Sequence, residues 1–362
     1  MASTVRGGPA RSPVCPRSGV VGAAPRTMPR RSSRLRTKAA KANVARGGQL
    51  SLDEDGNIEL ELVRNTRDLS VATPRCRPGA LLRTACPAEA SGADVELFSE
   101  HVGVTELLDL RSEEEQREDD AAAVLAGCIT VDRLYDRDDR APGGLAVQET
   151  TMDRSGDAQP EATFVRHRLS LLDRDRFYKA LLWKLPKLTV ARALVTQIWD
   201  GQGSKNIFLD AINAGGLPLL YEILIDTSKP EICKSLQVAT ECVEGGGTLL
   251  FYCKAGKDRT GLIAMLVLGL LGCSDAEIIS DFAKSDKHRK VALGGMENKP
   301  ELKRLDREVF SRAPPEAMEH ILGYVKARYG SIEAYCSSIG FDATWQRRLR
   351  SALLMSEAGP DN

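Results

Sequence analysis

A cysteine and an arginine six residues apart lie in a polar segment that could carry covalent chemistry. The segment reads Cys253-Lys254-Ala255-Gly256-Lys257-Asp258-Arg259-Thr260-Gly261. The thiolate is the nucleophilic form of cysteine, and its pKa falls beside cations and helix N-termini. Arg259 can bind two phosphate oxygens through its planar fork and present the phosphorus to the sulfur of Cys253. These residue types predict attack of Cys253 on a phosphate ester and a phosphocysteine intermediate.

Two apolar stretches flank this segment and would position it. Leu249–Tyr252 has the composition of a buried strand, and Leu262–Leu271 is a helix-like run bounded by Gly272. A strand that leads into a helix through a tight loop directs backbone N–H groups to one point, where the helix dipole adds its positive end. Gly256 and Gly261 permit the tight backbone. We therefore expect an anion-binding loop.

The segment resembles the signature loop of the cysteine-dependent protein tyrosine phosphatase superfamily, Cys-x5-Arg followed by Ser or Thr. Its Gly-Lys-Asp-Arg-Thr-Gly form is similar to the atypical branch that includes bacterial tyrosine and lipid phosphatases. The run from Lys254 to Lys257 resembles the dual-lysine loop of phosphoinositide 3-phosphatases. The resemblance implies a phosphomonoester hydrolase that needs no metal or other cofactor. Its substrate would be phosphotyrosine, a related phosphoprotein or a phosphoinositide.

Earlier segments resemble the opening of the same branch. RNTRDL, RPGALLRT and TELLDLRSEEE follow one another in the chain. They match the patterns Asn-x-Arg-Asp, Arg-Pro-Gly-x-x-x-Arg and Asp-Leu-Arg-x-x-x-Glu in the order that the branch shows. The resemblance therefore covers both ends of the expected catalytic domain.

One residue departs from the pattern. The superfamily usually has His immediately before the cysteine, whereas this chain has Tyr252, which carries no positive charge near neutral pH. Two alternatives to an active enzyme therefore stay open. One is a catalytically weak or inactive pseudophosphatase that binds phosphorylated partners, and the other is a plain buried cysteine at a strand end. A nucleotide-binding P-loop is rejected, because no Gly-x4-Gly-Lys-Ser/Thr occurs.

The remaining polar side chains of the loop have candidate roles. Thr260 can donate its hydroxyl to the sulfur, which makes the thiolate a better leaving group. A general acid must protonate the leaving oxygen. In relatives with this loop, the aspartate that corresponds to Asp258 is a proposed acid or substrate contact, and helix N-capping is its other interpretation. Asp173 and Asp175 are further candidates for the acid, with ordinary surface charge as their other interpretation.

The two loop lysines bear on the substrate. Lys254 and Lys257 beside a phosphate site suit a multiply phosphorylated or acidic substrate, and their other interpretation is stabilisation of the thiolate. A lipid substrate would also require a basic or amphipathic surface that faces the membrane. The sequence shows no clear surface of this kind outside its N-terminal tail.

Charge is distributed unevenly along the 362 residues. Residues 1–50 hold 11 Lys or Arg and no Asp or Glu, and the remainder holds 39 basic and 50 acidic residues. The acidic body argues against nucleic acid as the main partner. The tail has the composition of a disordered plastid (chloroplast) transit peptide, with a mitochondrial peptide, a nuclear localisation patch at Pro29–Lys41, or a plain solvated tail of a cytoplasmic protein as alternatives.

Strand-like and helix-like segments alternate beyond the tail. They predict an α/β fold, a mostly parallel central sheet flanked by helices as in protein tyrosine phosphatases, over residues 56–356. The polar stretch 136–162 predicts a long loop or variable insertion. Three large aromatic residues, Trp183, Trp199 and Tyr221, are interpreted as core or helix-packing residues.

Two classes of feature are not predicted. The nine cysteines and four histidines are scattered without metal-ligand spacing, so no metal site is expected. The apolar run Leu262–Leu271 is about half the length of a membrane span and predicts a buried helix, so no transmembrane segment is expected. The oligomeric state is left open.

Overall fold

A computed structural model describes residues 51–118, 123–151, 162–292 and 304–355. The N-terminal tail of residues 1–50 lies outside the described residues. Its assignment as a plastid transit peptide therefore stays a prediction.

The described residues form one seven-stranded sheet, and the predicted α/β class is confirmed. The strand order is β1-β2-β7-β3-β6-β4-β5, in which β2, β7, β3, β6 and β4 are parallel neighbours. Only the edge strands β1 and β5 are antiparallel to their neighbours. The strands are β1 Arg67–Asp68, β2 Leu81–Thr84, β3 Glu106–Asp109, β4 Ile129–Arg137, β5 Leu145–Thr151, β6 Phe164–Arg168 and β7 Leu249–Tyr252.

β7 lies in the interior of the sheet because all four of its side chains are apolar or aromatic and buried. Successive side chains of a strand point to opposite faces. Leu249 and Phe251 accordingly pack in one hydrophobic cluster, and Leu250 and Tyr252 pack in a second cluster on the other face. A buried parallel strand of this kind is covered by helices on both sides.

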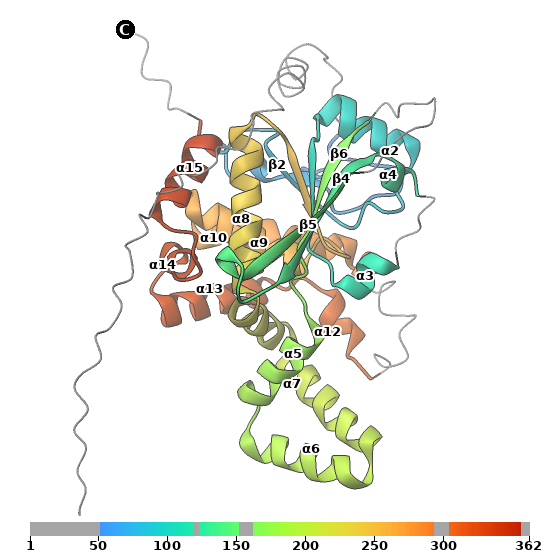
Figure 1. Cartoon of the computed structure of the whole chain (residues 1–362), viewed down its shortest axis with the longest axis vertical. Helices are drawn as coiled ribbons and strands as arrows, with labels where there is room; N and C mark the ends of the chain where they lie inside the picture. The colour runs from blue at the N-terminus through green and yellow to red at the C-terminus, as the bar shows by residue number, and fades with distance from the viewer. Residues whose placement is uncertain (1–50, 119–122, 152–161, 293–303, 356–362) are drawn as a thin grey trace, which may run out of the picture.

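Helices cover both faces of the sheet (Figure 1). The larger cluster lies under α8 Lys229–Glu244, α9 Asp258–Leu270, α10 Asp275–Ala283, α13 Pro315–Tyr329, α14 Ile332–Ser338 and α15 Ala343–Leu353. The smaller cluster lies under α2 Gly92–Glu96, η2 Leu97–Val102 and α4 Val124–Gly127. Shorter elements are η1 Leu69–Val71, α3 Glu113–Arg117, η3 Pro142–Gly144, η4 Lys284–His288 and α12 Arg307–Ser311.

The predicted buried helix after the polar segment is α9, which begins at Asp258. Its residues from Arg259 to Leu270 are all buried, so it is apolar on every side, as a core helix must be. It ends where Gly272 takes a φ of +79°, a conformation that favours glycine.

The prediction of a long loop over residues 136–162 is wrong for its first part. β4 continues to Arg137, and β5 pairs with it in an antiparallel register from Val131–Thr151 to Arg137–Leu145. The last five residues of β5 are all exposed, as the edge position of this strand in the sheet allows. Residues 152–161 lie outside the described residues, and a variable insertion there stays a prediction.

Three helices form a projection from the body. α5 Arg174–Lys184, α6 Lys187–Trp199 and the first part of α7 Gly201–Thr227 extend away from the sheet (Figure 1). α7 is long and apolar enough, by length and composition, to cross a membrane. It is broken at Gly216, where φ is +54°, and its second half is buried in the core. We therefore describe α7 as a core helix that continues into the projection, and we call residues 174–215 the helical arm.

Candidate active site

The polar segment 253–261 connects β7 to α9 at the carboxyl edge of the sheet. Its first residue, Cys253, follows β7, which lies between the parallel strands β2 and β3. In parallel sheets ligands bind at this edge of the strands. Cys253 has a relative exposure of 1%, and it packs with the larger hydrophobic cluster. The sulfur thus belongs to the floor of the loop.

The backbone of the loop offers a run of free donors. In the part of the chain that the structure describes, the N–H groups of residues 254–260 donate to no backbone carbonyl and no side chain. The first internal hydrogen bond of this stretch runs from the Gly261 N–H to the Lys257 carbonyl, at 2.7 Å. Buried N–H groups are nearly always paired, so consecutive unpaired ones at a helix N-terminus are suited to an oxyanion.

Gly256 makes the turn of the loop possible. Its φ is +66°, and a Cβ at this position would lie 2.4 Å from the carbonyl oxygen of Thr84. Both the backbone conformation and the close approach to β2 therefore require glycine. Gly261 is also close-packed, because an added Cβ would lie 3.2 Å from the ring of Phe282.

The carbonyl side of the loop is held by Asn65, from the segment just before β1. Its side-chain N–H₂ donates to the Ala255 carbonyl at 3.0 Å and to the Gly256 carbonyl at 3.1 Å. Arg83 of β2 donates a further hydrogen bond to the Gly256 carbonyl at 2.8 Å. With these carbonyls bound on one side, the adjoining amides are free to point to the other. Asn65 itself has a φ of +57°, which asparagine tolerates better than most residues.

A buried carboxylate fixes the groups that hold the loop. Asp281 of α10 accepts from Arg67 Nε at 2.7 Å and from an Nη of Arg83 at 2.5 Å. Arg67 also donates to the Asn65 side-chain oxygen at 2.6 Å. Burial alone would raise the pKa of Asp281, but the two guanidinium groups lower it to about 2. A buried charge is tolerated when it is paired and hydrogen-bonded, as these three are.

Arg259 is held in place by Glu115. The two terminal nitrogens of Arg259 donate to the two carboxylate oxygens of Glu115, at 2.5 and 2.9 Å. Glu115 is itself positioned by a capping box at the start of α3, in which Ser112 N–H and Oγ donate to one of its oxygens. Burial would raise the pKa of Glu115, but Arg259 above all holds it well below its usual range.

Arg259 and Arg83 supply positive charge around Cys253. Burial opposes the charged form of Arg259, yet Glu115, and then Cys253 and Asp258, raise its pKa above the ordinary value. Burial lowers the pKa of Arg83 to about 10, against the effects of Asp281 and Cys253. A guanidinium has five N–H donors, so the two that Glu115 takes leave others of Arg259 for a ligand.

Thr260 and Asp258 lie in the first turn of α9. The hydroxyl of Thr260 is buried and has no hydrogen-bond partner among the described residues, so its donor is free for the sulfur or a bound oxyanion. Asp258 is the first residue of α9 and does not cap it. Its carboxylate instead accepts from the Tyr221 hydroxyl at 2.7 Å, and Lys257 Nζ lies 3.3 Å from the same oxygen. Burial raises the pKa of Tyr221 well above its ordinary value, so Tyr221 acts as the donor.

The two lysines of the loop differ in their environments. Lys257 is 1% exposed, and its Nζ donates to the carbonyls of Phe310 and Arg312 at 2.7 and 2.6 Å. This arrangement ties the loop to the end of α12 and leaves Lys257 unsuited to hold a substrate. Lys254 is half-buried and has no ion pair in the described part of the chain, so it is the loop lysine that can meet a substrate.

Tyr252 points to the face of the sheet opposite Cys253. It packs in the smaller cluster, and the guanidinium of Arg111 lies 5.6 Å from the centre of its ring. Burial, followed by the charge of Asp109, raises the pKa of Tyr252 well above its ordinary value. Tyr252 therefore stays neutral and fills the core beneath the loop, while the cations nearest Cys253 come from Arg83 and Arg259.

The other carboxylates considered from the sequence are on α5. Asp173 caps this helix by accepting from the Arg176 N–H at 2.8 Å, and Asp175 is exposed in its first turn. Among the described residues, no group of three His, Cys, Asp or Glu side chains is arranged to hold a metal ion.

Sequence reasoning did not assign the residues that hold the loop. Asn65, Arg67, Arg83 and Glu115 lie in the three N-terminal motifs, so the signal for their importance was present. The motifs gave no loop partner for Asn65, Arg83 or Glu115, because their contacts with the loop span more than a hundred residues of chain. Asp281 lies in no motif and is found only from the structure.

Comparisons with known proteins show which family this chain resembles. A family model described as "Tyrosine phosphatase family" matches residues 58–355. A Nostoc commune protein named tyrosine-protein phosphatase is 34% identical over 105 residues, which are 26% of this chain and 35% of that protein. A Cupriavidus necator protein, provisionally named a tyrosine-protein phosphatase, is 48% identical over 44 residues, which are 12% of this chain and 16% of that protein. The chain thus matches about a third or less of the length of each relative.

Proposed function

This chain belongs to the tyrosine phosphatase family, and we propose that it hydrolyses phosphomonoesters through a phosphocysteine intermediate on Cys253. The observation that carries the proposal is the run of unpaired amides at residues 254–260, with Cys253 at its start and Arg259 braced by Glu115. These groups match an anion whose charge increases as it reacts, which is the requirement for electrostatic stabilisation of a transferring phosphoryl group.

In the first step the Cys253 thiolate attacks phosphorus and forms an S–P bond, and the bond from phosphorus to the alcohol oxygen breaks. The leaving oxygen takes a proton from a carboxyl group, for which Asp258 at the mouth of the loop is the best-placed candidate. In the second step water attacks phosphorus, its proton passes to the same carboxylate, and the S–P bond breaks. Thr260 donates to the sulfur as it leaves.

The pair of Tyr221 and Asp258 supports this role for Asp258. The hydroxyl holds one carboxylate oxygen at 2.7 Å, which leaves the other oxygen for the substrate. The two other candidates for the acid are less suited. Asp173 caps α5, and Asp175 is exposed to solvent.

Cys253→Ser tests the proposal. We expect the variant to lose turnover of a simple aryl phosphate and to keep binding of inorganic phosphate, measured by calorimetry, because the amides and Arg259 remain. Equal turnover by the wild type and Cys253→Ser would refute it. A panel of phosphotyrosine peptides, phosphoserine or phosphothreonine peptides and phosphoinositides would then identify the substrate class.

The second candidate function is a pseudophosphatase that binds phosphorylated partners. Tyr252 favours it, because a neutral side chain stands where the superfamily usually has histidine. This alternative predicts phosphate binding without turnover in the wild type. It also predicts that Tyr252→His gains measurable activity, whereas in an active enzyme the buried imidazole beside Arg111 would give no gain.

A further inference from the structure

The helical arm carries an apolar surface that the rest of the described chain does not cover. Trp183 and Trp199, predicted from the sequence to be core or helix-packing residues, have relative exposures of 90% and 86%, so this prediction is wrong for both. Tyr221, the third aromatic residue of that prediction, is fully buried. Monomeric soluble proteins rarely leave contiguous apolar surfaces in water, so this exposed apolar surface indicates an interaction site.

The exposed apolar residues follow the period of a helix. On α6, Leu188, Ala191, Val195 and Ile198 recur every three or four residues, and Trp199 adjoins them. The opposite side of α6 carries Ala193, which is fully buried. α6 thus has two apolar sides, and only one of them packs on the protein.

The arm has an excess of basic residues, whereas the chain beyond the N-terminal tail has an excess of acidic ones. Residues 174–215 hold seven Lys or Arg and three Asp or Glu, whereas residues 51–362 as a whole hold 39 and 50. On the arm, the side chains of Lys179, Lys187, Arg192 and Lys205 have no ion pair in the described part of the chain, and all four are exposed. Lys187 and Arg192 lie on α6 beside the apolar stripe.

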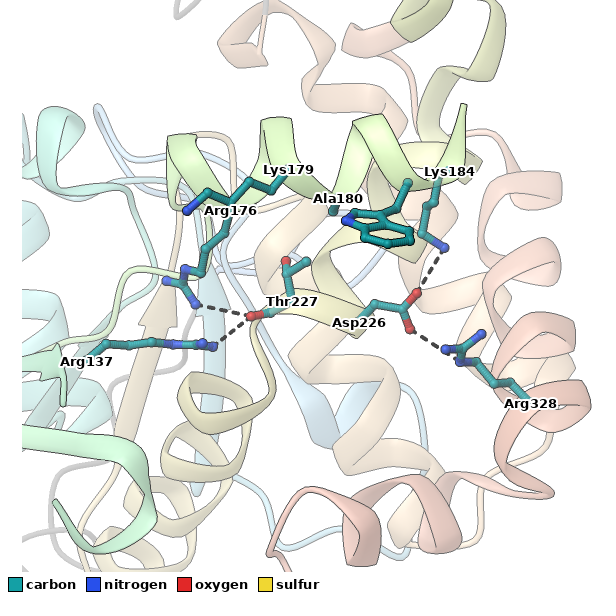
Figure 2. A pocket seen from close by; sticks show the side chains of 9 residues that line it. Arg137, Arg176, Lys179, Ala180, Lys184, Asp226, Thr227 and Arg328 are labelled. Carbon is teal, nitrogen blue, oxygen red and sulfur yellow. Dashed lines mark hydrogen bonds and ion pairs between the residues drawn. The ribbon is translucent and has the colours of Figure 1, made fainter. Parts of the chain in front are cut away.

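A polar cavity adjoins the base of the arm (Figure 2). It has a volume of about 560 Å³, and its lining includes Trp183, Lys179 and four further cations that are ion-paired with Glu222, Asp226 or Glu231. Arg137 and Arg176 approach the Thr227 carbonyl from two elements, at 2.7 and 3.1 Å, while Lys184 faces Asp226 (Figure 2). Among the lining cations, Lys179 of α5 has no ion pair in the described part of the chain.

From this combination we propose that the helical arm docks the protein on an anionic membrane surface. Tryptophan and aliphatic side chains flanked by lysine and arginine are the composition of helices that lie in the membrane interface. The exposed arm cations Lys179, Lys187, Arg192 and Lys205 match the negative surface of such a membrane. A second copy of the chain is disfavoured as the occupant, because arm-to-arm contact would bring like charges together. The proposal does not depend on the phosphatase activity.

Vesicle binding by the full chain tests this proposal. The probe is phosphatidylcholine vesicles with and without phosphatidylserine, and the wild type should bind the anionic ones more strongly. The arm variant Leu188→Ser/Ile198→Ser/Trp199→Ser should lose about tenfold or more in partition to them. The matched control Leu62→Ser/Val147→Ser, at apolar residues that are also exposed but lie on the body, should bind like the wild type. Lys187→Gln/Arg192→Gln should weaken binding, whereas Arg347→Gln on α15 should not.

Tryptophan fluorescence separates arm insertion from attraction of the basic N-terminal tail. The chain has three tryptophans, and the one outside the arm, Trp345, packs between Phe341 and Arg348. Insertion predicts a blue shift and quenching by brominated lipids, both absent in Trp183→Phe/Trp199→Phe.

Three results would overturn the proposal. The first is vesicle binding without quenching of tryptophan, and the second is an arm variant that binds like the wild type. The third is light scattering that reveals a dimer which the arm variant abolishes, without vesicle binding by the wild type.

Discussion

The hydrogen bonds from Asn65 to the loop carbonyls predict the effect of removing one side chain 190 residues from Ala255 in the chain. Asn65→Gly is the cleanest substitution, because glycine accepts the φ of +57° without strain. The change removes two N–H donors from the loop and one acceptor from Arg67. All of these groups are buried.

The cost follows from which groups lose their last partner. The Gly256 carbonyl keeps its bond from Arg83 at 2.8 Å, whereas the Ala255 carbonyl keeps no other donor among the described residues. Arg67 keeps Asp281 through its Nε, but its Nη1, which donates to the Asn65 oxygen at 2.6 Å, is left without that acceptor. Leaving a buried polar group unsatisfied costs about 1–3 kcal/mol, so the two orphaned groups amount to roughly 2–6 kcal/mol of unfolding free energy.

Part of this loss of free energy should lower the population of the loop conformation described above, in which the amides of residues 254–260 are suited to an oxyanion; we call this conformation the closed loop. A loss of about 1.4–2.7 kcal/mol in the closed loop corresponds to a decrease of about 10- to 100-fold in kcat/KM for an aryl phosphate. Urea unfolding gives the stability, and kcat/KM measured well below the unfolding transition gives the activity of folded protein. Asn65→Ala should cost about 1–2 kcal/mol more in stability, because alanine at this φ is strained. If Asn65→Gly loses stability while its kcat/KM stays within about twofold of wild type, Asn65 does not shape the loop and the reasoning is wrong.

Three other predictions concern the same site. Glu115→Gln leaves the buried charge of Arg259 uncompensated and should lower the unfolding free energy by about 3 kcal/mol, with a parallel fall in kcat/KM. The control Glu114→Gln, at an exposed neighbour, should change neither the unfolding free energy nor kcat/KM. Gly256→Ala places a Cβ 2.4 Å from the Thr84 carbonyl and should lower kcat/KM by more than about tenfold. The control Gly323→Ala, which has open space around it, should leave the stability unchanged or raise it by up to about 1 kcal/mol. Normal activity in Gly256→Ala would contradict the loop geometry. The ionised form of Asp281 should contribute about 2 kcal/mol to the free energy of unfolding, because its pKa is about 2 in the folded state against an ordinary value of 3.8. Since the pKa is lower in the folded state than in the unfolded state, this stabilisation is present above about pH 4 and is lost as pH falls towards 2. The difference in unfolding free energy between wild type and Asp281→Asn should therefore become smaller in acid. A difference that stays constant with pH would count against the ion pairs.

Local sequence was sufficient for the centre of the fold. The strand Leu249–Tyr252, the polar loop and the buried helix after it follow from apolar runs and glycines within 25 residues. The structure has all three where the sequence predicts them. Continuous apolar runs must be buried, and that requirement can be recognised from the run itself without knowledge of distant residues. The α/β class followed from the alternation of these patterns.

Long-range contacts account for what the sequence could not supply. Lys257 was expected at the substrate, but its charge is satisfied by two carbonyls more than 50 residues away. Asp258 was considered as a helix cap, but Tyr221 from α7 takes its carboxylate. The apolar residues of the arm read as core because composition alone does not reveal which side of a helix is left uncovered.

The brace of the loop has a consequence for how the protein is made. Ala255 and Gly256 are bound by Asn65 near the start of the described chain, and Asn65 depends through Arg67 on Asp281, which is synthesised after the loop itself. A nascent chain that ends before α10 contains Cys253 but lacks the carboxylate that anchors the two arginines. We expect such a chain to be inert on the ribosome. We also expect Cys253 to acquire its surroundings among the last steps of folding, because contacts of large sequence separation form late.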